Sequence, residues 1–556
     1  MPDRVFPILE WLPGYRRADL TGDLVAGITG AAILIPQSMA YATIAGLPPV
    51  VGLYASVVPL LVYAVLGRSA PLGVGPLASI SILSALAVGS LAHGDSARFI
   101  ALSATLAVLV GGIHILVGVL RLGFVLRLVS EPVVTGFLAA IGVLLIVTQL
   151  GVMTGVQVPT AGRVDTIVVR WIQALGHSTA SLSTLALALA SVALLLFARR
   201  WRRFPAPLVL VIFSTAVSGA LMLSHHGIAT VGPVPKGLPA PKVPPFHGAD
   251  VLALLPTAFA ITLISVLESV SVARRYADEH GYRISTDQEI VALGAANVSA
   301  GFFQGFVVTG AISRTSILDE SGARTPLTGV VSAAVVVPVL AFAAGLFRNL
   351  PLAVLSAIVI TAVLPFLDVG EARRLWRVKR SDFWTMMLAF VGSLVFGILE
   401  GVLLAAATSI VLIVTRVARS PLPELGRQSG TDAFVERHRH PDAVTFPGAV
   451  ILRVNTPLYF TNAESLENRL RALVATHPEI DTVVLDASGV DHLDATADHA
   501  LRRVATDYAA RRVAFYLVNL DEESRQVLDA SGFTDLVGPD HYFATDADAV
   551  AHLTSR

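Results

Sequence analysis

Residues 24–67 read LVAGITGAAILIPQSMAYATIAGLPPVVGLYASVVPLLVYAVLG and contain no Asp, Glu, Lys or Arg. The hydrocarbon core of a bilayer is about 30 Å thick and requires about 20 apolar residues per helix, so this stretch can cross a membrane twice. A helix at the surface of a soluble protein would instead carry charged residues on its outer face. Similar apolar runs recur as far as about residue 415. The sequence therefore predicts an integral membrane protein.

The composition agrees with a membrane protein and excludes several other classes. Hydrophobic residues make up 54% of the chain and charged residues 14%, whereas an ordinary soluble domain has roughly 25% charged residues. The formal net charge is zero, which argues against a nucleic-acid partner because such a partner requires a basic surface. The chain has no cysteine, so thiol catalysis, disulfides and cysteine-based zinc sites are excluded. We expect no metal and no cofactor.

About fourteen apolar stretches can form complete or partial membrane segments. They lie near residues 23–45, 50–66, 76–91, 98–120, 130–152, 181–198, 207–223, 251–273, 288–303, 311–319, 325–347, 351–367, 383–397 and 398–418. Several of these stretches are short or contain Pro and Gly. We expect each stretch to form one transmembrane segment.

The distribution of basic residues predicts the orientation of these segments. Residues 1–22 carry several charges and do not resemble a cleaved signal peptide, so we expect a cytoplasmic N-terminal segment. With fourteen segments, the basic clusters fall on the same side as both termini, and Lys236 and Lys242 are the main exceptions. The clusters lie at residues 121–127, 199–203, 274–283 and 373–380. Because basic loops stay in the cytoplasm, we expect both termini there.

The character of the sequence changes near residue 421. Beyond this point the apolar runs are only as long as strands, and they alternate with stretches whose apolar residues recur at helical spacing. Such alternation predicts a small α/β domain. We therefore divide the chain into a transmembrane domain at 23–420, a linker at 421–448 and a cytoplasmic domain at 449–556.

Two short stretches of the membrane part resemble each other. Residues 75–83 read GPLASISIL and residues 310–318 read GAISRTSIL. They belong to the third and tenth apolar stretches, which correspond if the chain consists of two halves of seven. Because seven is odd, the second half would be inserted upside down. Small and aliphatic residues also coincide by chance, but short segments interrupted by Gly or Pro at matching places are typical of a transporter's binding site.

These two stretches predict an anion site. A helix that begins inside the membrane directs unpaired N–H groups and the positive end of its dipole at whatever lies there. Two such helix starts that face each other can therefore hold an anion.

Two charged residues stand alone in apolar surroundings. Arg314 is the only charged residue in 291–318, and Glu268 is the only one in 251–273. A charge at a helix centre facing lipid costs at least about 2.5–3.5 kcal/mol, so each should face protein or a water-filled cavity. Arg314 either places a fixed positive charge beside the anion or pairs with carbonyl groups or Glu268. Glu268 is either a proton acceptor or a structural counter-ion.

Several longer motifs resemble those of one transporter family. They are IPQSMAYATIAGLPPVVGLY at 35–54, SEPVVTGF at 130–137, LESVSVAR at 267–274 and the segment 297–314. In this order they are similar to the sulfate permease (SulP) family of anion transporters, over nearly the whole chain. The resemblance implies an α-helical membrane protein with fourteen transmembrane segments in two inverted seven-helix repeats, as in uracil transporters. It also implies a core domain that moves against a gate domain, a homodimer and a C-terminal STAS domain.

The resemblance further implies that the substrate lies between the starts of the third and tenth segments. The residues that match the family's substrate-binding positions are Gln37, Tyr41, Pro76, Leu77, Ala78, Ser313 and Arg314, and the proton-coupling position is Glu268. The family often has an aromatic residue at the position of Leu77, so this pocket should be wider or less stacked. Some members hold an acidic residue for sodium where this chain has Val272, which favours proton coupling.

The C-terminal domain resembles a STAS domain with an altered loop. Residues 482–494 read TVVLDASGVDHLD and match the strand and loop of such domains. Bacterial relatives continue with Asp-Ser-Ser/Thr-Gly, whereas this chain has DATA at 494–497. Thr496 occupies the position that is phosphorylated in STAS proteins that antagonise anti-sigma factors. The missing Gly alters the loop that presents Thr496, so two interpretations stay open. Thr496 is either a regulatory site or part of a structural helix N-terminus.

The leading hypothesis is a secondary transporter in the plasma membrane that takes up a small anion, most simply sulfate, together with protons. Bicarbonate and C4-dicarboxylates are alternatives, because backbone N–H groups and one arginine bind a carboxylate as well as a sulfate. An exchanger, a channel-like conductor and a sensor that signals through the C-terminal domain are other classes. We expect no enzyme activity, because no nucleophile–base pair lies within the apolar stretches. The expected partners are a small anion, membrane lipid and a second copy of the chain.

Overall fold

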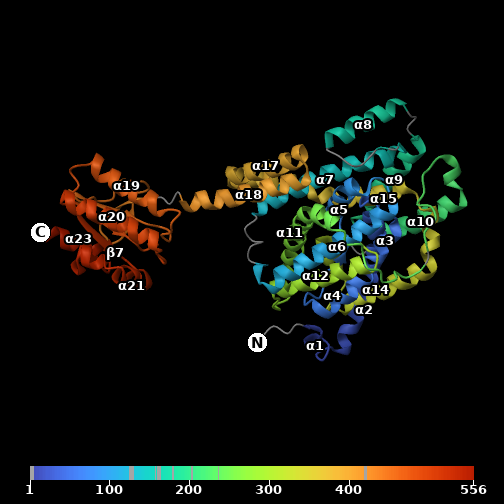
Figure 1. Cartoon of the computed structure of the whole chain (residues 1–556), viewed down its shortest axis with the longest axis horizontal. Coiled ribbons are helices and arrows are strands. Elements are labelled where there is room, and N and C mark those ends of the chain that lie inside the picture. Colours follow the sequence, from blue (N-terminus) through green and yellow to red (C-terminus); the bar gives the residue numbers. More distant parts are fainter. Residues whose placement is uncertain are drawn as a thin grey trace. The chain divides into compact units, whose positions relative to one another are not determined.

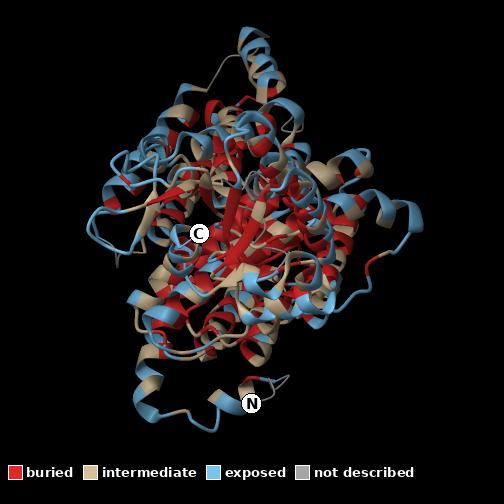
Figure 2. Ribbon diagram, turned by 90° about the vertical axis from the view of Figure 1, so that its left-hand side faces the viewer, coloured by how far each residue is buried: buried red, intermediate tan, exposed pale blue. Residues whose placement is uncertain are grey.

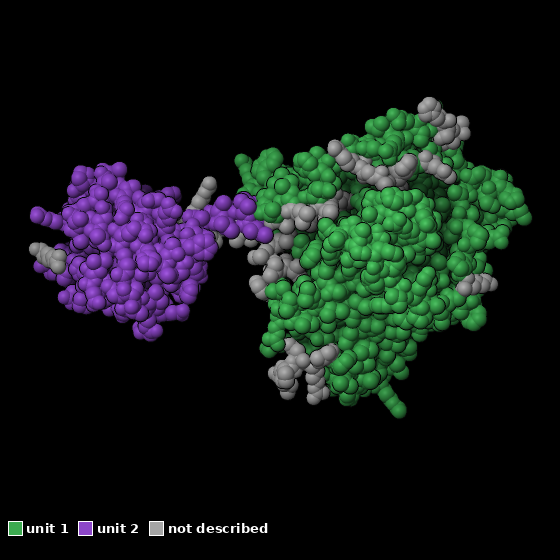
Figure 3. Space-filling view, in the orientation of Figure 1, with its two compact units in different colours: residues 1–409 green, residues 410–556 purple. Residues whose placement is uncertain are grey.

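The computed structural model describes residues 6–123, 130–156, 158, 164–177, 181–201, 205–235, 237–418 and 422–555. Some basic residues used to predict the orientation lie outside these ranges, namely Arg127, Arg202, Arg203 and Lys236. The chain divides into two compact units, Met1–Ser409 and Ile410–Arg556, which are coloured separately in Figure 3. Each unit has its own apolar core.

The first unit is built almost entirely from helices (Figure 1). The α-helices are α1 Ile8–Trp11, α2 Arg17–Ile44, α3 Pro49–Tyr54, α4 Val58–Leu66, α5 Ala78–Ala92, α6 Ser96–Val119, α7 Glu131–Thr154, α8 Val164–His177, α9 Leu182–Ala198, α10 Ala206–Ala220, α11 Gly248–Glu279, α12 Thr286–Phe302, α13 Ile312–Glu320, α14 Leu327–Pro338, α15 Leu352–Val363, α16 Val369–Val378, α17 Arg380–Phe396 and α18 Ile398–Ala418, which continues into the second unit. Short 3-10 or π turns lie at η2 Leu223–His226, η3 Val339–Ala343, η4 Ala344–Asn349 and η5 Leu364–Phe366.

Every apolar stretch expected from the sequence contains a helix or a run of short helices. Among the described residues, seven helical segments are long and apolar enough to cross a membrane. In contrast, α5 has 15 residues and α13 has 9, so at 1.5 Å per residue they extend only about 22 and 14 Å. The two stretches that resemble each other therefore form half-helices. The helical membrane fold predicted from the sequence is confirmed.

Each half-helix follows a two-residue strand. The strands are β1 (Val74–Gly75) and β2 (Thr309–Gly310), and they pair antiparallel with Val74 opposite Gly310. Because the strands run in opposite directions, α5 and α13 leave this ribbon from its opposite ends. Two segments inserted with opposite orientations require this arrangement, so the pairing agrees with an inverted repeat.

Two glycines let the β1–β2 ribbon pass close to its neighbours. A Cβ atom on Gly73 would lie 2.6 Å from the Cβ of Arg314, and one on Gly75 would lie 2.8 Å from the Cδ1 of Leu34. These separations are below any ordinary van der Waals contact. A side chain at either position would therefore force the ribbon away from α13 or α2.

The second unit is a six-stranded sheet with helices on both faces. The strand order is β4-β3-β5-β6-β7-β8; β5 to β8 are parallel, and β3 is antiparallel to β4 and β5. The strands are β3 Glu424–Arg427, β4 Phe434–Glu436, β5 Ala449–Arg453, β6 Thr482–Asp486, β7 Ala514–Val518 and β8 Tyr542–Phe543. The helices are α19 Ala463–Thr476, α20 Ala495–Arg511, α21 Glu522–Ala530, α22 Phe533–Val537, η6 Pro539–His541 and α23 Asp546–Thr554.

An apolar layer fills each face of this sheet. On one face, Leu470, Tyr508 and Leu528 bring α19, α20 and α21 against the strands. On the other face, Val550 of α23 packs in the same cluster as Tyr516 of β7. Figure 2 shows strands of this sheet in red, as buried residues. The alternating strands and helices predicted from the sequence are confirmed.

The sheet begins earlier in the chain than the sequence analysis placed it. Residues 421–448 were expected to be a linker, but they contain β3 and β4, and β3 pairs directly with β5. Both strands are short and only partly buried, so no apolar pattern marks them locally. Their long-range pairing defines them, and the folded domain therefore starts at residue 424 rather than at residue 449.

Candidate functional site

The starts of α5 and α13 have the property that an anion site requires. Leu77 and Ala311, the residues just before these helices, have extended backbones and provide no capping hydrogen bond from a side chain. The first N–H groups of an uncapped helix lack intrahelical partners, and the helix dipole places partial positive charge there. Both half-helices thus present unpaired N–H groups near the β1–β2 ribbon.

The Arg314 side chain is buried at this ribbon and is held by carbonyl groups. Its Nη1 donates to the carbonyl oxygen of Pro76 at 2.7 Å, its Nε to that of Gly73 at 3.2 Å and its Nη2 to that of Thr309 at 3.5 Å. Among the described residues, no carboxylate forms an ion pair with Arg314. Pairing with carbonyl groups, one of the two alternatives for Arg314, is therefore present, and no described carboxylate neutralises its charge.

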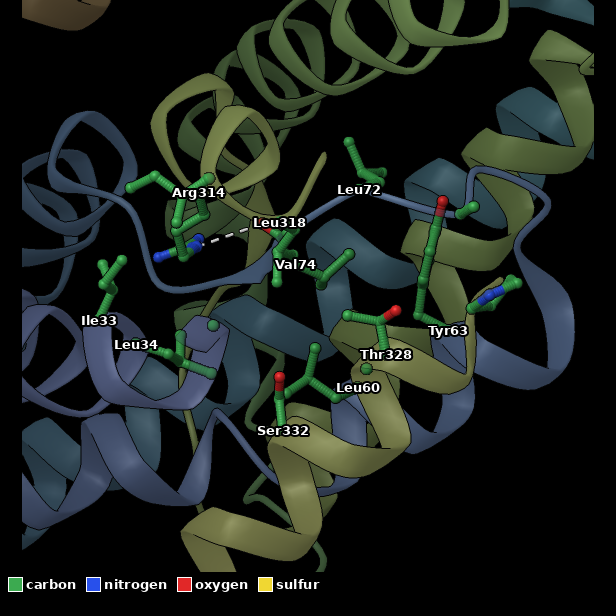
Figure 4. A pocket seen from close by; sticks show the side chains of 16 residues that line it. Ile33, Leu34, Leu60, Tyr63, Leu72, Val74, Arg314, Leu318, Thr328 and Ser332 are labelled. Atoms are coloured by element: carbon green, nitrogen blue, oxygen red, sulfur yellow. Dashed lines mark hydrogen bonds between the residues drawn. The ribbon is translucent and has the colours of Figure 1, made fainter. Parts of the chain in front are cut away.

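A small cavity beside Arg314 is too apolar and too small for a substrate (Figure 4). In Figure 4, Arg314 lies near Ile33 and Leu34 of α2, and a dashed line marks its hydrogen bond to Gly73. The volume of this cavity is about 20 Å³, which is enough for about one water molecule. The anion would therefore have to lie elsewhere, at the starts of the half-helices.

Glu268 is half-buried, and it lines a cavity while one of its carboxylate oxygens is fully buried. Its Oε2 atom is buried and has no hydrogen-bond partner within the described part of the chain, and the same holds for the Ser79 hydroxyl of α5. The two side chains are close enough to interact. Glu268 of α11 thus lies beside the first turn of α5, where it can exchange a proton or accept a hydrogen bond.

A cavity of about 480 Å³ connects Glu268 to the start of α13. We call it the first cavity; Glu131 and Thr135 of α7, Glu268 and Arg274 of α11 and Ile312 of α13 line it. Its volume is many times that of the small cavity beside Arg314. A hydrated sulfate or a dicarboxylate can therefore enter it and reach the first turn of α13.

The other predicted substrate residues lie around the same place. Tyr41, Leu77 and Ala78 are buried and belong to one apolar cluster that also contains Ala311. Gln37 is buried one helical turn before Tyr41 on α2. Tyr41 is also close enough to Arg314 for an electrostatic interaction. These residues belong to distant parts of the sequence, and the fold brings them together.

Ser313 differs from the other predicted residues because it is exposed. It is the second residue of α13, and its neighbour Ile312 lines the first cavity. The start of α13 is therefore open toward the first cavity, whereas Ala78 at the start of α5 is 1% exposed. An anion that enters the first cavity would meet the α13 N–H groups first.

Three polar residues that the sequence analysis did not single out fix the ribbon. The Thr309 hydroxyl of β2 lies 2.8 Å from the hydroxyl of Ser265 and 2.7 Å from that of Ser269. The Gly310 N–H donates to the Ser269 hydroxyl at 2.8 Å. Asn297 of α12 donates to the Val308 carbonyl and accepts from the Val308 N–H. Ser265 and Ser269 are one helical turn apart, but small polar residues at such spacing also occur elsewhere in the apolar stretches, so the sequence alone does not mark them.

The middle of α7 packs against the predicted site. Phe137, Ile141 and Leu144 are buried in the same cluster as Tyr41 and Leu77. Phe137 belongs to the SEPVVTGF motif, to which no role in the site was assigned from the sequence. These side chains form an apolar block that faces the start of α5.

Cavities lie on either side of this apolar block. The first cavity is lined by α7 between Glu131 and Leu138. A second cavity of about 430 Å³ is lined by Thr148, Gln149 and Val152 of α7, together with residues of α2, α5 and α15. The two cavities thus lie along opposite ends of one helix; the first also reaches the start of α13, and the second is lined by α5 beyond its first turn, from Ile82 to Gly89.

Thr496 lies in the other unit and is exposed. It is the second residue of α20, and the carboxylate of Asp494 caps the Ala497 N–H of this helix at 2.9 Å. Thr496 is therefore accessible at a helix N-terminus although the loop lacks the expected glycine.

The fold and the site together define a class of protein: a helical membrane transporter with a STAS domain at its C-terminus. Residues 20–389 match the sulfate permease family, and residues 440–549 match the STAS domain. The chain belongs to the sulfate permease family.

Known proteins resemble this chain over nearly its whole length. A "Probable sulfate transporter" of Mycobacterium tuberculosis (strain ATCC 25618 / H37Rv) is 37% identical, over 98% of both chains. "Sulfate transporter 4.1, chloroplastic" of Arabidopsis thaliana is 32% identical over 99% of this chain and 82% of its own.

Two solved structures resemble the fold. The inward-facing structure of murine Solute Carrier 26 family member A9, an anion transporter, is 27% identical, has a TM-score of 0.92 and covers 99% of this chain and 94% of its own. The transmembrane domain of the cyanobacterial bicarbonate transporter BicA is 24% identical, has a TM-score of 0.61 and covers 71% of this chain and 98% of its own. The second likeness concerns the fold alone.

Proposed function

We propose that this protein is a secondary active transporter that moves a small anion, most simply sulfate, together with protons. The observation that carries the proposal is the pair of uncapped half-helix starts beside Arg314, whose charge no described carboxylate neutralises. Unpaired N–H groups, helix dipoles and a fixed positive charge all favour an anion over a cation. The named sulfate transporters among the relatives support sulfate as the substrate.

In this proposal the substrate contacts come from three elements. Pro76, Leu77 and Ala78 form the start of α5, and Ser313 and Arg314 form the start of α13. The side chains of Gln37 and Tyr41 on α2 complete the site. Arg314 acts mainly through its charge, because its N–H groups already hold carbonyl oxygens.

Glu268 provides the proposed coupling to protons. Its carboxyl lies between the first cavity and the start of α5. A proton from water in this cavity would neutralise the carboxyl whenever the anion is bound. In Glu268→Gln we expect no accumulation driven by a proton gradient but normal exchange of internal for external sulfate. Accumulation at the wild-type rate would contradict this role.

The two cavities along α7 support transport by alternating access. The core domain with α5 and α13 would move against a gate domain that contains α7, so that the site connects to one cavity at a time. The apolar block of Phe137, Ile141 and Leu144 would keep both cavities from joining. A continuous channel would instead need a polar path through this block.

We also propose a plasma-membrane location with both termini in the cytoplasm, because the basic clusters lie on the side of the termini. We propose a homodimer as well, on the basis of the family resemblance. Thr496 is proposed as a regulatory site, since a phosphate there would lie at the N-terminus of α20.

The experiment that tests the proposed function is uptake into proteoliposomes. We expect radioactive sulfate to accumulate above its external concentration when a proton gradient is imposed, and to equilibrate only when the gradient is collapsed. Gradient-independent equilibration would identify a channel or an exchanger.

The size of the first cavity favours a second candidate substrate class. About 480 Å³ is more space than one sulfate needs, and Leu77 leaves the pocket wider than an aromatic residue at this position would. The extra space favours a C4-dicarboxylate as a competitor of sulfate, and bicarbonate stays an alternative because backbone N–H groups and one arginine also bind a carboxylate. Competition of labelled sulfate by bicarbonate, fumarate and succinate in the same vesicles would rank these anions.

A further inference from the structure

The helix α16 and the start of α17 form a surface that the transport proposal does not use. We call it the basic–aromatic face and define it by Arg373, Trp376, Arg377, Arg380 and Trp384. Trp376 is 43% exposed and Trp384 is 62% exposed. Large aromatic side chains with that much exposed surface are unusual in water and are enriched where protein meets the membrane interface.

The charge of this surface is positive and partly unpaired. Five basic residues and two acidic residues lie between residues 371 and 382. Arg374 pairs with Glu371 at 2.7 Å, and Lys379 lies 4.0 Å from Asp382. Arg373 and Arg377 form no ion pair with an acidic residue in the described part of the chain. Two arginines are therefore available for an external anionic group.

The aromatic side chains hold the surface in shape. The ring of Trp376 packs edge-on against Phe383, with 4.9 Å between centroids, and lies 6.4 Å from the ring of Trp384. The Arg380 guanidinium lies 5.2 Å from the centroid of the Trp376 ring. These contacts join α16 to α17 and leave the indole rings exposed.

The surface adjoins a helix whose outer side is apolar. From Arg380, α17 continues into an apolar stretch in which Leu388, Val391 and Val395 are exposed. In a membrane protein such side chains face lipid tails. The basic–aromatic face at the start of the same helix should then lie at the level of the lipid headgroups.

We propose that the basic–aromatic face binds anionic phospholipid headgroups, with Arg373 and Arg377 contacting the phosphates and the two tryptophans lying between the headgroups. The positive charge, the aromatic belt and the adjoining apolar helix surface all match an anionic lipid surface. A soluble phosphate would match the arginines but not the exposed tryptophans.

The test measures lipid preference of the full-length protein by native mass spectrometry. The protein is titrated with phosphatidylglycerol and, separately, with phosphatidylcholine, and the ratio of apparent affinities is compared between variants. In Arg373→Gln/Arg377→Gln we expect this ratio to fall by about fivefold for each arginine removed. Arg373→Lys/Arg377→Lys should retain most of the preference, because the charge is kept.

The matched control is Arg437→Gln/Arg439→Gln, which removes two exposed arginines from the C-terminal domain and should leave the ratio unchanged. Glycerol phosphate should not displace the bound lipid. An unchanged ratio in Arg373→Gln/Arg377→Gln, or an equal fall for both lipids, would overturn the proposal. Displacement by glycerol phosphate would assign the arginines to a soluble anion instead.

Discussion

At the scale of single residues, a structural role and the proposed binding role of Arg314 can be separated. Its N–H groups hold the carbonyl oxygens of Gly73 and Pro76, and its charge faces the half-helix starts. We predict that Arg314→Ala weakens sulfate binding by about tenfold to a hundredfold, the usual range for a lost charge-assisted contact. Arg314→Lys keeps the charge and should lose less. Calorimetry on folded protein, verified by its thermal midpoint, measures both; an unchanged affinity in Arg314→Ala would remove Arg314 from the site.

Asp546 in the C-terminal domain gives a prediction about pH. Burial, and then the charge of Asp486, raise the pKa of Asp546 to about 6, above about 3.9 for an unfolded Asp. A raised folded pKa stabilises the protonated form, so this contribution is complete below pH 4 and is lost as the pH rises through 6. We expect Asp546→Asn to lessen the loss of stability between pH 4.5 and pH 7.5.

Urea unfolding of residues 422–555 at both pH values measures this effect. Asp540→Asn, at an exposed position of the same domain, is the control and should behave as the unmodified domain does. If the unfolding free energy of Asp546→Asn changed with pH by the same amount as that of the unmodified domain, the Asp546 carboxyl would not titrate in that range.

Charged residues of the proposed site are easier to recognise in the sequence than neutral ones. Arg314 and Glu268 stand out because each is alone in an apolar stretch, where an unused charge is costly. Ser265, Ser269 and Asn297 could not be recognised, because small polar residues also occur elsewhere in the apolar stretches. Only the packed structure shows that these three hold β2.

At the scale of elements, the half-helices were visible in the sequence but their pairing was not. The Gly and Pro at 75–76 break the third apolar stretch, and 310–318 repeats part of its pattern. The ribbon contact between Val74 and Gly310 joins residues far apart in the chain, and no local pattern encodes it. The same limit explains why β3 and β4 were assigned to a linker.

The close packing at the start of α5 predicts the effect of a larger side chain. Ala78 is 1% exposed in an apolar cluster, so the added ring of Ala78→Phe must occupy the space proposed for the anion. We expect sulfate uptake to fall to background. Ala190→Phe, at an exposed position of α9, is the control and should transport normally. Normal uptake by Ala78→Phe would show that the anion does not bind at the start of α5.

At the scale of the whole molecule, the helical membrane fold and the small C-terminal α/β domain followed from the sequence. The two cavities along α7 did not, because they depend on how α7 packs against α2, α5, α11 and α15. Apolar residues such as Ile141 look alike in a sequence whether they face lipid or separate two cavities.

The most direct test of the proposed site uses the absence of cysteine from the chain. Ser313→Cys introduces a single thiol at the exposed start of α13, and its rate of labelling by uncharged N-ethylmaleimide is measured in reconstituted protein. Thr496→Cys, exposed in the other unit, is the control. We predict that saturating substrate anion slows labelling at residue 313 several-fold and leaves labelling at residue 496 unchanged. Equal labelling at residue 313 with and without an anion that the same vesicles transport would contradict a site between the half-helices.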